Sequence, residues 1–423
     1  MAATQVTADV IKDGTITATQ IADGTITAGK LAAGVLDGAG GDISWQSSVK
    51  TSDFTGVAGE GYFVDTTSST VTVTLPSSPS VGDLISFIDY GGNTTVNPIV
   101  FTTSDNIEGG SGNKGIQYSK GAVQLIFSGS TKGWLSANAA GEGSEALRDP
   151  ITSVDVNFLV LAGGGGQNSN GYYNGGAGAG GLRTSTGSTY SGGGATLENA
   201  VTLNLLQDYT ITLGAGGSAR SSFFQNAGNG TDTTFASITA DGGAGGYYNG
   251  SNSGGCGAGG GSSNVASRAG GAGTAGQGFA GGASSSTNNG GPGGGGGTAS
   301  AGGTGSGQVG GAGGAGINNN ITGTLSYYGA GGGGMRGGGS GGGYGANGTG
   351  WSTTRAQTGH GGSQSTPTGG SGVIILKWPS TFTATFSAGV VQNTTQISWN
   401  GALHYVSVIQ GGAGDTVSFA YTG

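Results

Sequence analysis

The chain has 423 residues, of which 102 are glycine, 34% are hydrophobic and only 8% are charged, so a conventional hydrophobic core cannot extend throughout it. Its formal net charge of −8, without any cluster of Lys or Arg, argues against binding to nucleic acid, whose phosphates it would repel. One cysteine, Cys256, and two histidines exclude an intramolecular disulfide and a Cys/His metal cage, and no apolar stretch approaches the roughly 18 residues of a membrane span.

Residues 1–42 are predicted to form an N-terminal shaft or attachment segment. Ile11–Ala18 (IKDGTITA) is repeated ten residues later as Ile21–Ala28 (IADGTITA), and the pattern fades over Leu31–Leu36. An Asp-Gly turn followed by Thr-Ile-Thr is typical of a strand, but each repeat carries too few apolar residues to fold alone. Copies from three chains side by side would supply the missing neighbours, and a disordered tail is the alternative.

Residues 43–138 have the composition of an ordinary β domain. Short alternating apolar runs recur between turn residues: Tyr62–Val64, Val71–Leu75, Leu84–Ile88, Pro98–Phe101 and Ala122–Phe127. Strands at this spacing predict a β-sandwich or a barrel. The polar stretch over residues 139–152 is predicted to be a linker.

Residues 153–378 form a glycine-rich region held between conventional strands. The sequence predicts strands over Val154–Leu161, Val201–Leu213, Thr233–Thr239 and Val373–Trp378. Residues 379–423 are predicted to be a C-terminal β module, with an Asn-Gly hairpin turn at Asn400–Gly401. Its core-facing candidates are Val406, Val408, Val417 and Phe419. No long amphipathic helix is expected, so the sequence predicts an all-β fold. The glycine runs would add a non-standard structure to it.

Two repetitive glycine structures are excluded by composition. Collagen needs glycine at every third position and abundant proline, whereas the glycine spacing here is irregular and the chain has only 7 prolines. Calcium-binding glycine repeats need carboxylates, and no Asp or Glu lies between Asp241 and Asp415.

A disordered linker and an ordered lattice remain as alternatives for the glycine runs. Glycine loses about 0.5–1 kcal/mol more than alanine when it is fixed, which favours a linker. Polyproline-II-like runs packed in rows would offset that loss by exchanging backbone hydrogen bonds, each worth about 1 kcal/mol net. The clamping strands and apolar anchors favour the lattice. The anchors are Phe223, Phe224, Phe235, Ile238, Phe279, Ile317, Ile321 and Leu325.

Catalytic chemistry has little support. Glycan cleavage needs paired carboxylates, which the long stretch after Asp241 lacks, and the carboxylates before it show no motif spacing. His360 has no nucleophile elbow nearby, and no GxGxxG match is followed by Gly-Lys-Ser/Thr. We therefore expect no enzyme activity, no catalytic or metal-binding residue and no cofactor.

Binding is better supported, because polar segments with aromatic residues interrupt the glycine runs. Tyr and Trp offer large contact areas at low entropic cost, and Asn and Ser offer adaptable hydrogen bonds. Arginines in the same region would contact phosphates of a glycolipid or simply be solvated. The candidate binding residues are Tyr172, Tyr173, Tyr247, Tyr248, Asn318, Tyr327, Tyr328, Tyr344, Trp351, Arg336 and Arg355. The alternative is that each Tyr-Tyr pair only caps a glycine layer.

Four segments together resemble a known family: Phe158–Gly166, Gly175–Arg183, Thr210–Gly217 and Gly370–Leu376. Their pattern resembles the glycine-rich domain of tail fibre proteins of marine bacteriophages. It is also similar in kind to the tip adhesins of T4-like phages, in which stacked polyglycine-II helices present variable loops to host receptors. Residues 61–76 and 128–134 likewise resemble a β module of cyanophage fibre and baseplate proteins. The N-terminal repeat and the β tail depart from the T4-type arrangement, in which the tip adhesin is a separate protein.

The resemblance implies a virion tail fibre, made in the host cytoplasm, that attaches a phage to its host through loops on the glycine-rich domain. It implies a homotrimer that is joined to other tail or fibre proteins through residues 1–42. The receptor would be a host cell-surface glycan or an outer-membrane protein, and neither nucleic-acid binding nor membrane insertion is expected. The alternative is a purely structural fibre or whisker component, with the glycine lattice as a rigid spacer.

Overall fold

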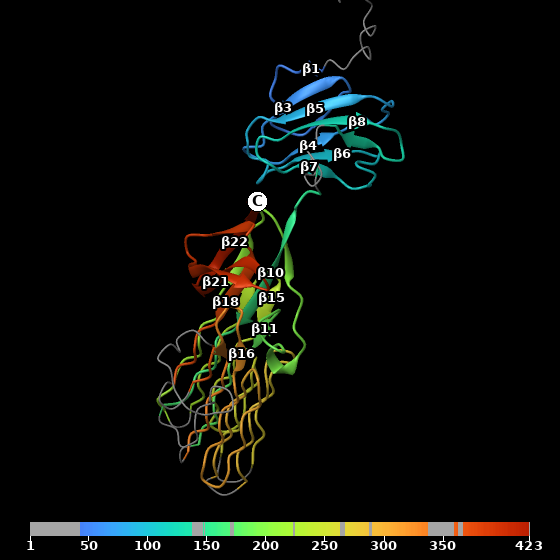
Figure 1. Cartoon of the computed structure of the whole chain (residues 1–423). Helices are drawn as coiled ribbons and strands as arrows, with labels where there is room; N and C mark the ends of the chain where they lie inside the picture. The colour runs from blue at the N-terminus through green and yellow to red at the C-terminus, as the bar shows by residue number, and fades with distance from the viewer. Residues whose placement is uncertain are drawn as a thin grey trace, which may run out of the picture. The chain divides into compact units, whose positions relative to one another are not determined.

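The computed structural model describes residues 43–137, 147, 149–169, 173–222, 225–262, 267–286, 290–336, 359–362 and 367–422. The predicted repeat over residues 1–42 lies outside them. The chain divides into two compact units, one ending at Pro150 and the other beginning at Ile151. Both are built of β-strands (Figure 1), which confirms the all-β class.

The first unit contains two sheets. One holds, in order, β1 (Ser44–Trp45), β3 (Glu60–Val64), β5 (Leu84–Asp89), β8 (Ala122–Phe127) and β9 (Trp134–Ser136). The other holds β2 (Phe54–Thr55), β4 (Val71–Thr74), β6 (Ile99–Thr102) and β7 (Lys114–Ile116). From β1 to β6 the chain crosses to the other sheet after each strand, so neighbours among these strands run parallel, and only the later strands join antiparallel.

Side chains from both sheets fill the space between them. The fully buried rings of Phe87 and Phe101, one from each sheet, lie 4.7 Å apart between their centroids. Burial alternates along β4 and β8, as expected for strands with one face toward a core. The segment therefore forms the predicted sandwich, although more of its strand pairs are parallel than a hairpin-connected sandwich would have.

The second unit has two larger sheets and a separate hairpin. The first sheet runs β11 (Leu182–Thr184), β10 (Ser153–Leu161), β18 (Val373–Pro379), β21 (Ala402–Gly411) and β20 (Val391–Trp399), and β12 (Val201–Asn204) also pairs with β10. The second sheet runs β15 (Ile238–Ala240), β14 (Thr233–Phe235), β13 (Tyr209–Thr212), β22 (Ala413–Tyr421) and β19 (Phe382–Phe386). The hairpin joins β16 (Ile317–Asn319) and β17 (Ser326–Tyr328).

The C-terminal strands complete both large sheets. β21 pairs antiparallel with β18, and β22 pairs antiparallel with β13. Trp378 of β18 packs edge-on against Phe419 of β22, with 5.4 Å between ring centroids, in a core shared by the two sheets. Three of the predicted core residues of the tail are buried: Val406, Val417 and Phe419. The boundary predicted at residue 379 therefore runs through a continuous pair of sheets.

Two predicted strands are divided in the structure. The segment Val201–Leu213 forms β12 and β13, which lie in different sheets, with left-handed Leu206 (φ 59°) between them. The segment Thr233–Thr239 contains a tight turn at Ala236 (φ 51°) that joins β14 to β15. Neither turn contains Gly or Pro, so the strongest sequence signals of a turn are missing at these points.

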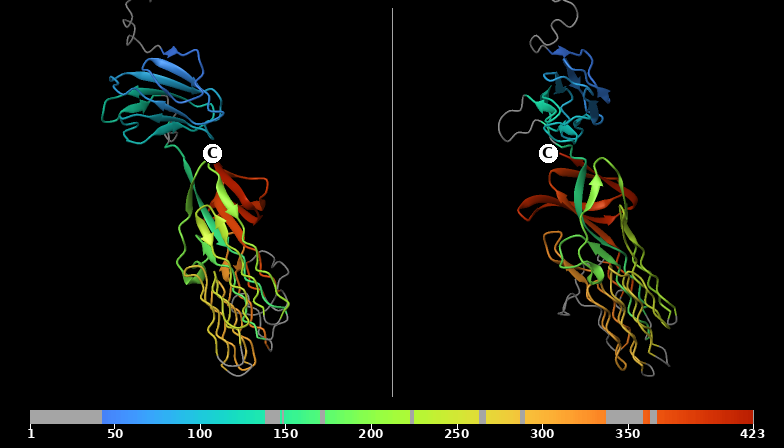
Figure 2. Two further views of the ribbon diagram at one scale, coloured as in Figure 1. Left: turned by 180° about the vertical axis from the view of Figure 1, so that it is seen from behind. Right: turned by 90° about the vertical axis from the view of Figure 1, so that its right-hand side faces the viewer.

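The glycine runs form an ordered lattice of extended segments that lie side by side (Figure 2). In the run Ala162–Gln167, successive N–H groups donate to three neighbouring runs in turn and return to the first after three residues, with N···O distances of 2.5–3.1 Å. Carbonyls of the same run accept from three further runs. The six neighbours are residues 178–181, 228–231, 367–370, 217–220, 243–246 and Gly362. This period of three residues is that of a polyproline-II-type helix. Of the two alternatives for the glycine runs, the described runs therefore form the ordered lattice and not a disordered linker.

Close approach between backbones explains why these positions are glycine. A methyl group added to Gly163 would lie 2.0 Å from the carbonyl oxygen of Ala215, and one added to Gly176 would lie 2.0 Å from that of Gly332. Such distances are shorter than any real carbon–oxygen contact. Glycine is therefore required by packing at these positions, and not by a positive φ.

The apolar anchors are only partly as predicted. Four are buried: Phe235, Ile238, Ile317 and Ile321. Phe279 is partly buried. Leu325 is 60% exposed, so its prediction as a buried anchor was wrong. It precedes β17 on the loop of the hairpin, whereas Ile317 and Ile321 face the strands beneath. Phe223 and Phe224 lie outside the described residues.

Candidate functional site

Tyr173 and Arg336, both predicted binding residues, meet where the chain turns between glycine runs. The guanidinium carbon of Arg336 lies 4.9 Å from the centroid of the Tyr173 ring. Their segments are joined by the backbone, because Met335 N donates to Asn174 O at 3.1 Å. A cation–π contact is worth about 0.5–1 kcal/mol at an exposed site and about 2 kcal/mol when desolvated, and both side chains here are partly buried. The pair therefore presents an aromatic face and a charge as one unit.

The residue beside this pair carries buried polar atoms without partners. Both the nitrogen and the oxygen of the Asn174 amide are buried and have no hydrogen-bond partner among the described residues, and the same holds for the hydroxyl of Ser262. Ser262 is a close neighbour, since its N–H donates to Tyr173 O at 2.9 Å. Buried polar atoms are rarely left unpaired. Within the described part of the chain, the polar atoms of Asn174 and Ser262 are thus left without partners at this end of the lattice.

Tyr247 and Tyr248 take part in the lattice through their backbone. Gly175 N donates to Tyr247 O at 3.0 Å, and Tyr248 N donates to the Asn226 side chain at 3.3 Å. Both side chains are partly exposed. The backbone of the pair therefore caps a glycine run, while its rings stay partly exposed. A capping role and a binding role are compatible for this pair.

Three further candidate binding residues lie on the hairpin β16–β17 and differ in their exposure to solvent. Asn318 pairs with Tyr327, and Ile317 pairs with Tyr328. Asn318 is exposed and Tyr327 partly exposed, but Tyr328 is only 8% exposed. It packs in a cluster with strands of the large sheet, and burial raises the pKa of its phenol. The prediction that Tyr328 displays its ring for binding is therefore corrected: it is a core residue.

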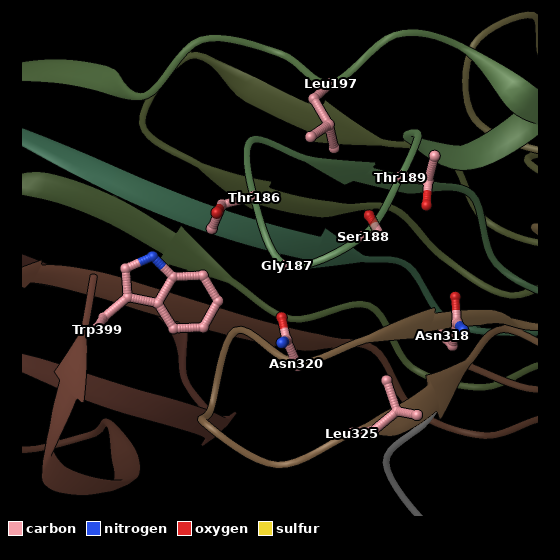
Figure 3. Close-up of a pocket in the computed structure, with 9 residues that line it drawn as sticks. All are labelled: Thr186, Gly187, Ser188, Thr189, Leu197, Asn318, Asn320, Leu325 and Trp399. Atoms are coloured by element: carbon pink, nitrogen blue, oxygen red, sulfur yellow. The ribbon is translucent and has the colours of Figure 1, made fainter. Parts of the chain in front are cut away.

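A pocket of about 420 Å³ lies beside the exposed side of this hairpin (Figure 3). One wall is the loop Thr186–Thr189, and the opposite wall is formed by Asn318, Asn320 and Leu325. Trp399, the last residue of β20, stands at one end. Leu197 completes the lining. Segments more than 200 residues apart in sequence thus meet at one site.

The two walls are fastened together by Asn319, whose side chain is fully buried. Its amide nitrogen donates to Thr186 O at 2.8 Å, and its amide oxygen accepts from Ile321 N at 2.8 Å. Asn320 N also donates to Gly187 O at 2.8 Å. Gly187 has φ +86°, and a methyl group there would lie 2.3 Å from the amide oxygen of Asn319. The geometry of the pocket is therefore set by the buried Asn319 side chain and by backbone groups, and not by the polar side chains that face it.

The side chains that face the pocket are polar but uncharged, apart from three apolar ones. Thr186, Thr189, Asn318 and Asn320 supply hydroxyl and amide groups, and within the described part of the chain these four side chains make no hydrogen bond. Leu197 is 36% exposed and Leu325 60% exposed, and both add apolar surface. The pocket therefore combines free donors and acceptors with an indole ring.

A buried lysine lies against that indole. Nζ of Lys377 is 3.2 Å from the centroid of the Trp399 ring, and the Lys377 side chain is fully buried. No hydrogen-bond partner for this nitrogen occurs among the described residues. Burial lowers the pKa of Lys377 to about 8. The ring stabilises the charge by about 2 kcal/mol, as expected for a desolvated cation–π pair.

Two further groups, the guanidinium of Arg183 and the thiol of Cys256, have structural roles. Arg183 forms a two-pronged ion pair with Glu198, with N···O distances of 2.8 and 2.6 Å, which raises the pKa of the guanidinium. Cys256 is fully buried, and burial raises the pKa of its thiol to about 12, so the reactive thiolate is suppressed. Within the described ranges no three His, Cys, Asp or Glu side chains gather as metal ligands, and no helix is long and apolar enough to cross a membrane.

Sequence reasoning found only part of this arrangement. Tyr172, Tyr344, Trp351 and Arg355 lie outside the described residues. Asn318 was predicted, but the loop Thr186–Thr189, Asn320 and Trp399 were missed. The available signal for Trp399 was an aromatic residue directly before the Asn-Gly turn, where a hairpin end is exposed.

Residues 140–379 match a protein-family model described as a glycine-rich domain. The match covers more than half of the chain and includes the lattice together with β10 to β18. It ends at Pro379, the last residue of β18, although the compact unit continues beyond that strand. No curated protein matches the chain.

Proposed function

The chain belongs to this glycine-rich domain family, and from that premise we propose that it is a receptor-binding tail fibre protein of a bacteriophage. One observation carries the proposal. Inside the runs the backbone bonds to other runs and close approach requires glycine at many positions, so large side chains that can reach a partner come mainly from the segments between the runs. A lattice of this kind holds those side chains rigidly, and such preorganisation reduces the entropy lost on binding.

The proposed receptor is a host cell-surface glycan or an outer-membrane protein. The Tyr173–Arg336 pair and the partly exposed rings of Tyr247 and Tyr248 offer flat aromatic faces. Aromatic rings with adaptable amides suit recognition of polar surfaces.

In this proposal the protein is a homotrimer in the virion, made in the host cytoplasm and joined to other tail or fibre proteins through residues 1–42. The ten-residue repeat there supports an assembly, because each unit carries too few apolar residues to fold without neighbours. Three copies that engage one surface gain avidity from individually weak contacts.

A purely structural fibre component is the second candidate. It is favoured by Tyr328, which serves the core, and by the backbone bonds of Tyr247 and Tyr248, which serve the lattice. In that case the lattice is a spacer and its turns have no receptor.

Cell binding tests the two candidates against each other. The labelled full-length protein is incubated with a panel of bacterial strains, cyanobacteria included, and bound fluorescence is measured. Strain-specific binding that falls at least about tenfold in a Tyr173→Ala/Arg336→Ala variant is expected for a receptor-binding fibre. Ala312→Ser, at an exposed position of the same lattice, is the matched control. Absence of binding to every strain, with the protein folded, would favour the spacer.

A further inference from the structure

We propose that the pocket beside Trp399 binds a neutral sugar residue of a cell-surface polysaccharide. This assignment rests on the proposed function, which brings the chain against a bacterial surface, and it adds a site and a ligand class. Every described residue that lines the pocket belongs to the second unit. Its volume of about 420 Å³ falls in the ordinary range of ligand pockets.

The indole of Trp399 supplies the apolar platform. One face of the ring is held by the ammonium of Lys377, at 3.2 Å from the ring centroid. The ring is therefore fixed in orientation, and its other face and edges remain for a ligand. The C–H groups on one side of a hexose ring form an apolar surface that stacks on such a face. A rigid aromatic ring gives this contact with little loss of rotamer entropy.

Hydroxyl and amide groups line the rest of the pocket. The side chains of Thr186, Thr189, Asn318 and Asn320 are free of internal hydrogen bonds within the described chain. An amide both donates and accepts hydrogen bonds, and so does a pair of neighbouring sugar hydroxyls. The two groups are therefore complementary. Figure 3 shows Asn318 and Asn320 on one wall, facing the threonines on the other. A sugar between them can be held from both sides while it stacks on Trp399.

The absence of charge in the lining determines the class of sugar. None of the lining residues is Asp, Glu, Lys or Arg. A sialic acid or a sugar phosphate would lose water around its charge without gaining a counter-charge, which is costly. Lys377 does not provide one, because its ammonium is fully buried behind the indole. The site is thus suited to a neutral hexose.

The pocket walls are also preorganised for binding. Asn319 bonds the hairpin to the loop, and Gly187 adopts the positive φ that this junction requires. Asn319 is fully buried and is not part of the lining, so a sugar in the pocket would not displace the bonds that hold the walls. Ligand binding then needs little rearrangement.

Direct measurement of sugar binding tests the proposal. The full-length protein is applied to immobilised maltotriose, cellotriose, mannotriose and galactose-based trisaccharides, with sialyllactose and glucose phosphate as charged probes. We expect binding to at least one neutral trisaccharide and none to the charged probes. Affinity for the bound trisaccharide is then measured by titration calorimetry. Trp399→Ala is expected to lower it at least about tenfold, and Trp399→Phe to restore part of the loss.

A second variant guards against loss of folding. Asn318→Ala/Asn320→Ala removes two exposed side chains and keeps the buried Asn319, so the hairpin is retained. It is expected to weaken sugar binding about tenfold with an unchanged melting temperature. Ala312→Ser, at an exposed position outside the lining, is expected to leave sugar affinity unchanged.

Two outcomes overturn the site: no neutral trisaccharide binds, or both pocket variants bind as well as the unaltered protein. Cell binding separates this failure from that of the proposed function. A protein that binds cells but no neutral sugar loses this site and keeps the function. A protein that binds neutral sugar through Trp399 but binds no cell keeps this site and loses the function.

Discussion

The ammonium of Lys377 lies 3.2 Å from the centroid of the Trp399 ring, so a side chain in the middle of one strand holds the last side chain of another. β21 lies between these two strands, and the contact reaches across it. Lys377 is fully buried while Trp399 is partly exposed at the pocket. The pair therefore links a charge inside the sheet to the wall of the candidate sugar site.

This buried charge predicts a pH dependence of stability. Burial lowers the pKa of Lys377 to about 8, whereas in the unfolded chain it is about 10.4. Below about pH 8 the amine is charged in both states, and the cost of burying it is fully present. Between these two values the unfolded chain binds more protons, so stability rises with pH. We expect the free energy of unfolding to increase by about 1–2 kcal/mol from about pH 7 to about pH 9.5.

Urea denaturation, followed by circular dichroism at several pH values, measures this increase. Lys377→Met keeps most of the side-chain volume and removes the titrating group, so its profile is expected to be flatter over the same window. An identical rise in both proteins would assign the effect to other groups and contradict the prediction.

Substitution inside the lattice predicts a large loss of stability. A methyl group at Gly176 would lie 2.0 Å from the carbonyl oxygen of Gly332, and both partners are backbone that cannot move alone. Gly176→Ala is expected to destabilise the second unit by about 3 kcal/mol or more, and to make the runs sensitive to thermolysin. Ala312→Ser, at an exposed position, is expected to change stability by less than about 0.5 kcal/mol. Equal melting temperatures for the two variants would argue against close backbone packing.

The existence of the lattice could be predicted from sequence, but its connections could not. Strands such as Val154–Leu161 and Val373–Trp378 showed that the glycine runs are clamped at both ends. The runs themselves are nearly identical in composition, so no side chain specifies that 162–167 lies beside 228–231 and 243–246. That choice follows from the strands and turns that start and end each run. It is a tertiary property without a local signal.

Two adjacent asparagines on β16 are predicted to contribute very differently to stability. Asn319 is fully buried and bonds Thr186 O and Ile321 N, whereas Asn318 next to it is exposed. Asn319→Ala removes the bond to Thr186 O and leaves the buried N–H of Ile321 unpaired, and it is expected to cost about 1–3 kcal/mol. Asn318→Ala is expected to change stability by less than about 0.5 kcal/mol. Thermal and urea denaturation of both variants compare them, and similar losses would mean that Asn319 does not hold the two walls together.

The same strand shows why the site was only partly predictable. In Asn318-Asn319-Asn320 the three side chains are chemically identical, and only the pairing of Ile317 with Tyr328 decides which of them faces inward. That pairing also places Tyr328 in the core, against its prediction as a displayed residue. Trp399 reaches the pocket because β20 pairs with β21, a long-range contact that sequence periodicity does not reveal.

Truncation after Pro379, where the family match ends, is predicted to prevent folding of the glycine-rich region. β18 would lose its partner β21, and β13 would lose β22. Trp378 would lose the ring of Phe419, and the buried Lys377 would lose its cover from Trp399. An exposed apolar sheet face and two open edges are expected to leave the protein aggregated and without a cooperative thermal transition. The matched control is residues 151–423, which form one compact unit and are expected to fold alone. A truncated chain that melts cooperatively and resists protease as this control does would show that the C-terminal strands are an independent module, as the sequence alone suggests.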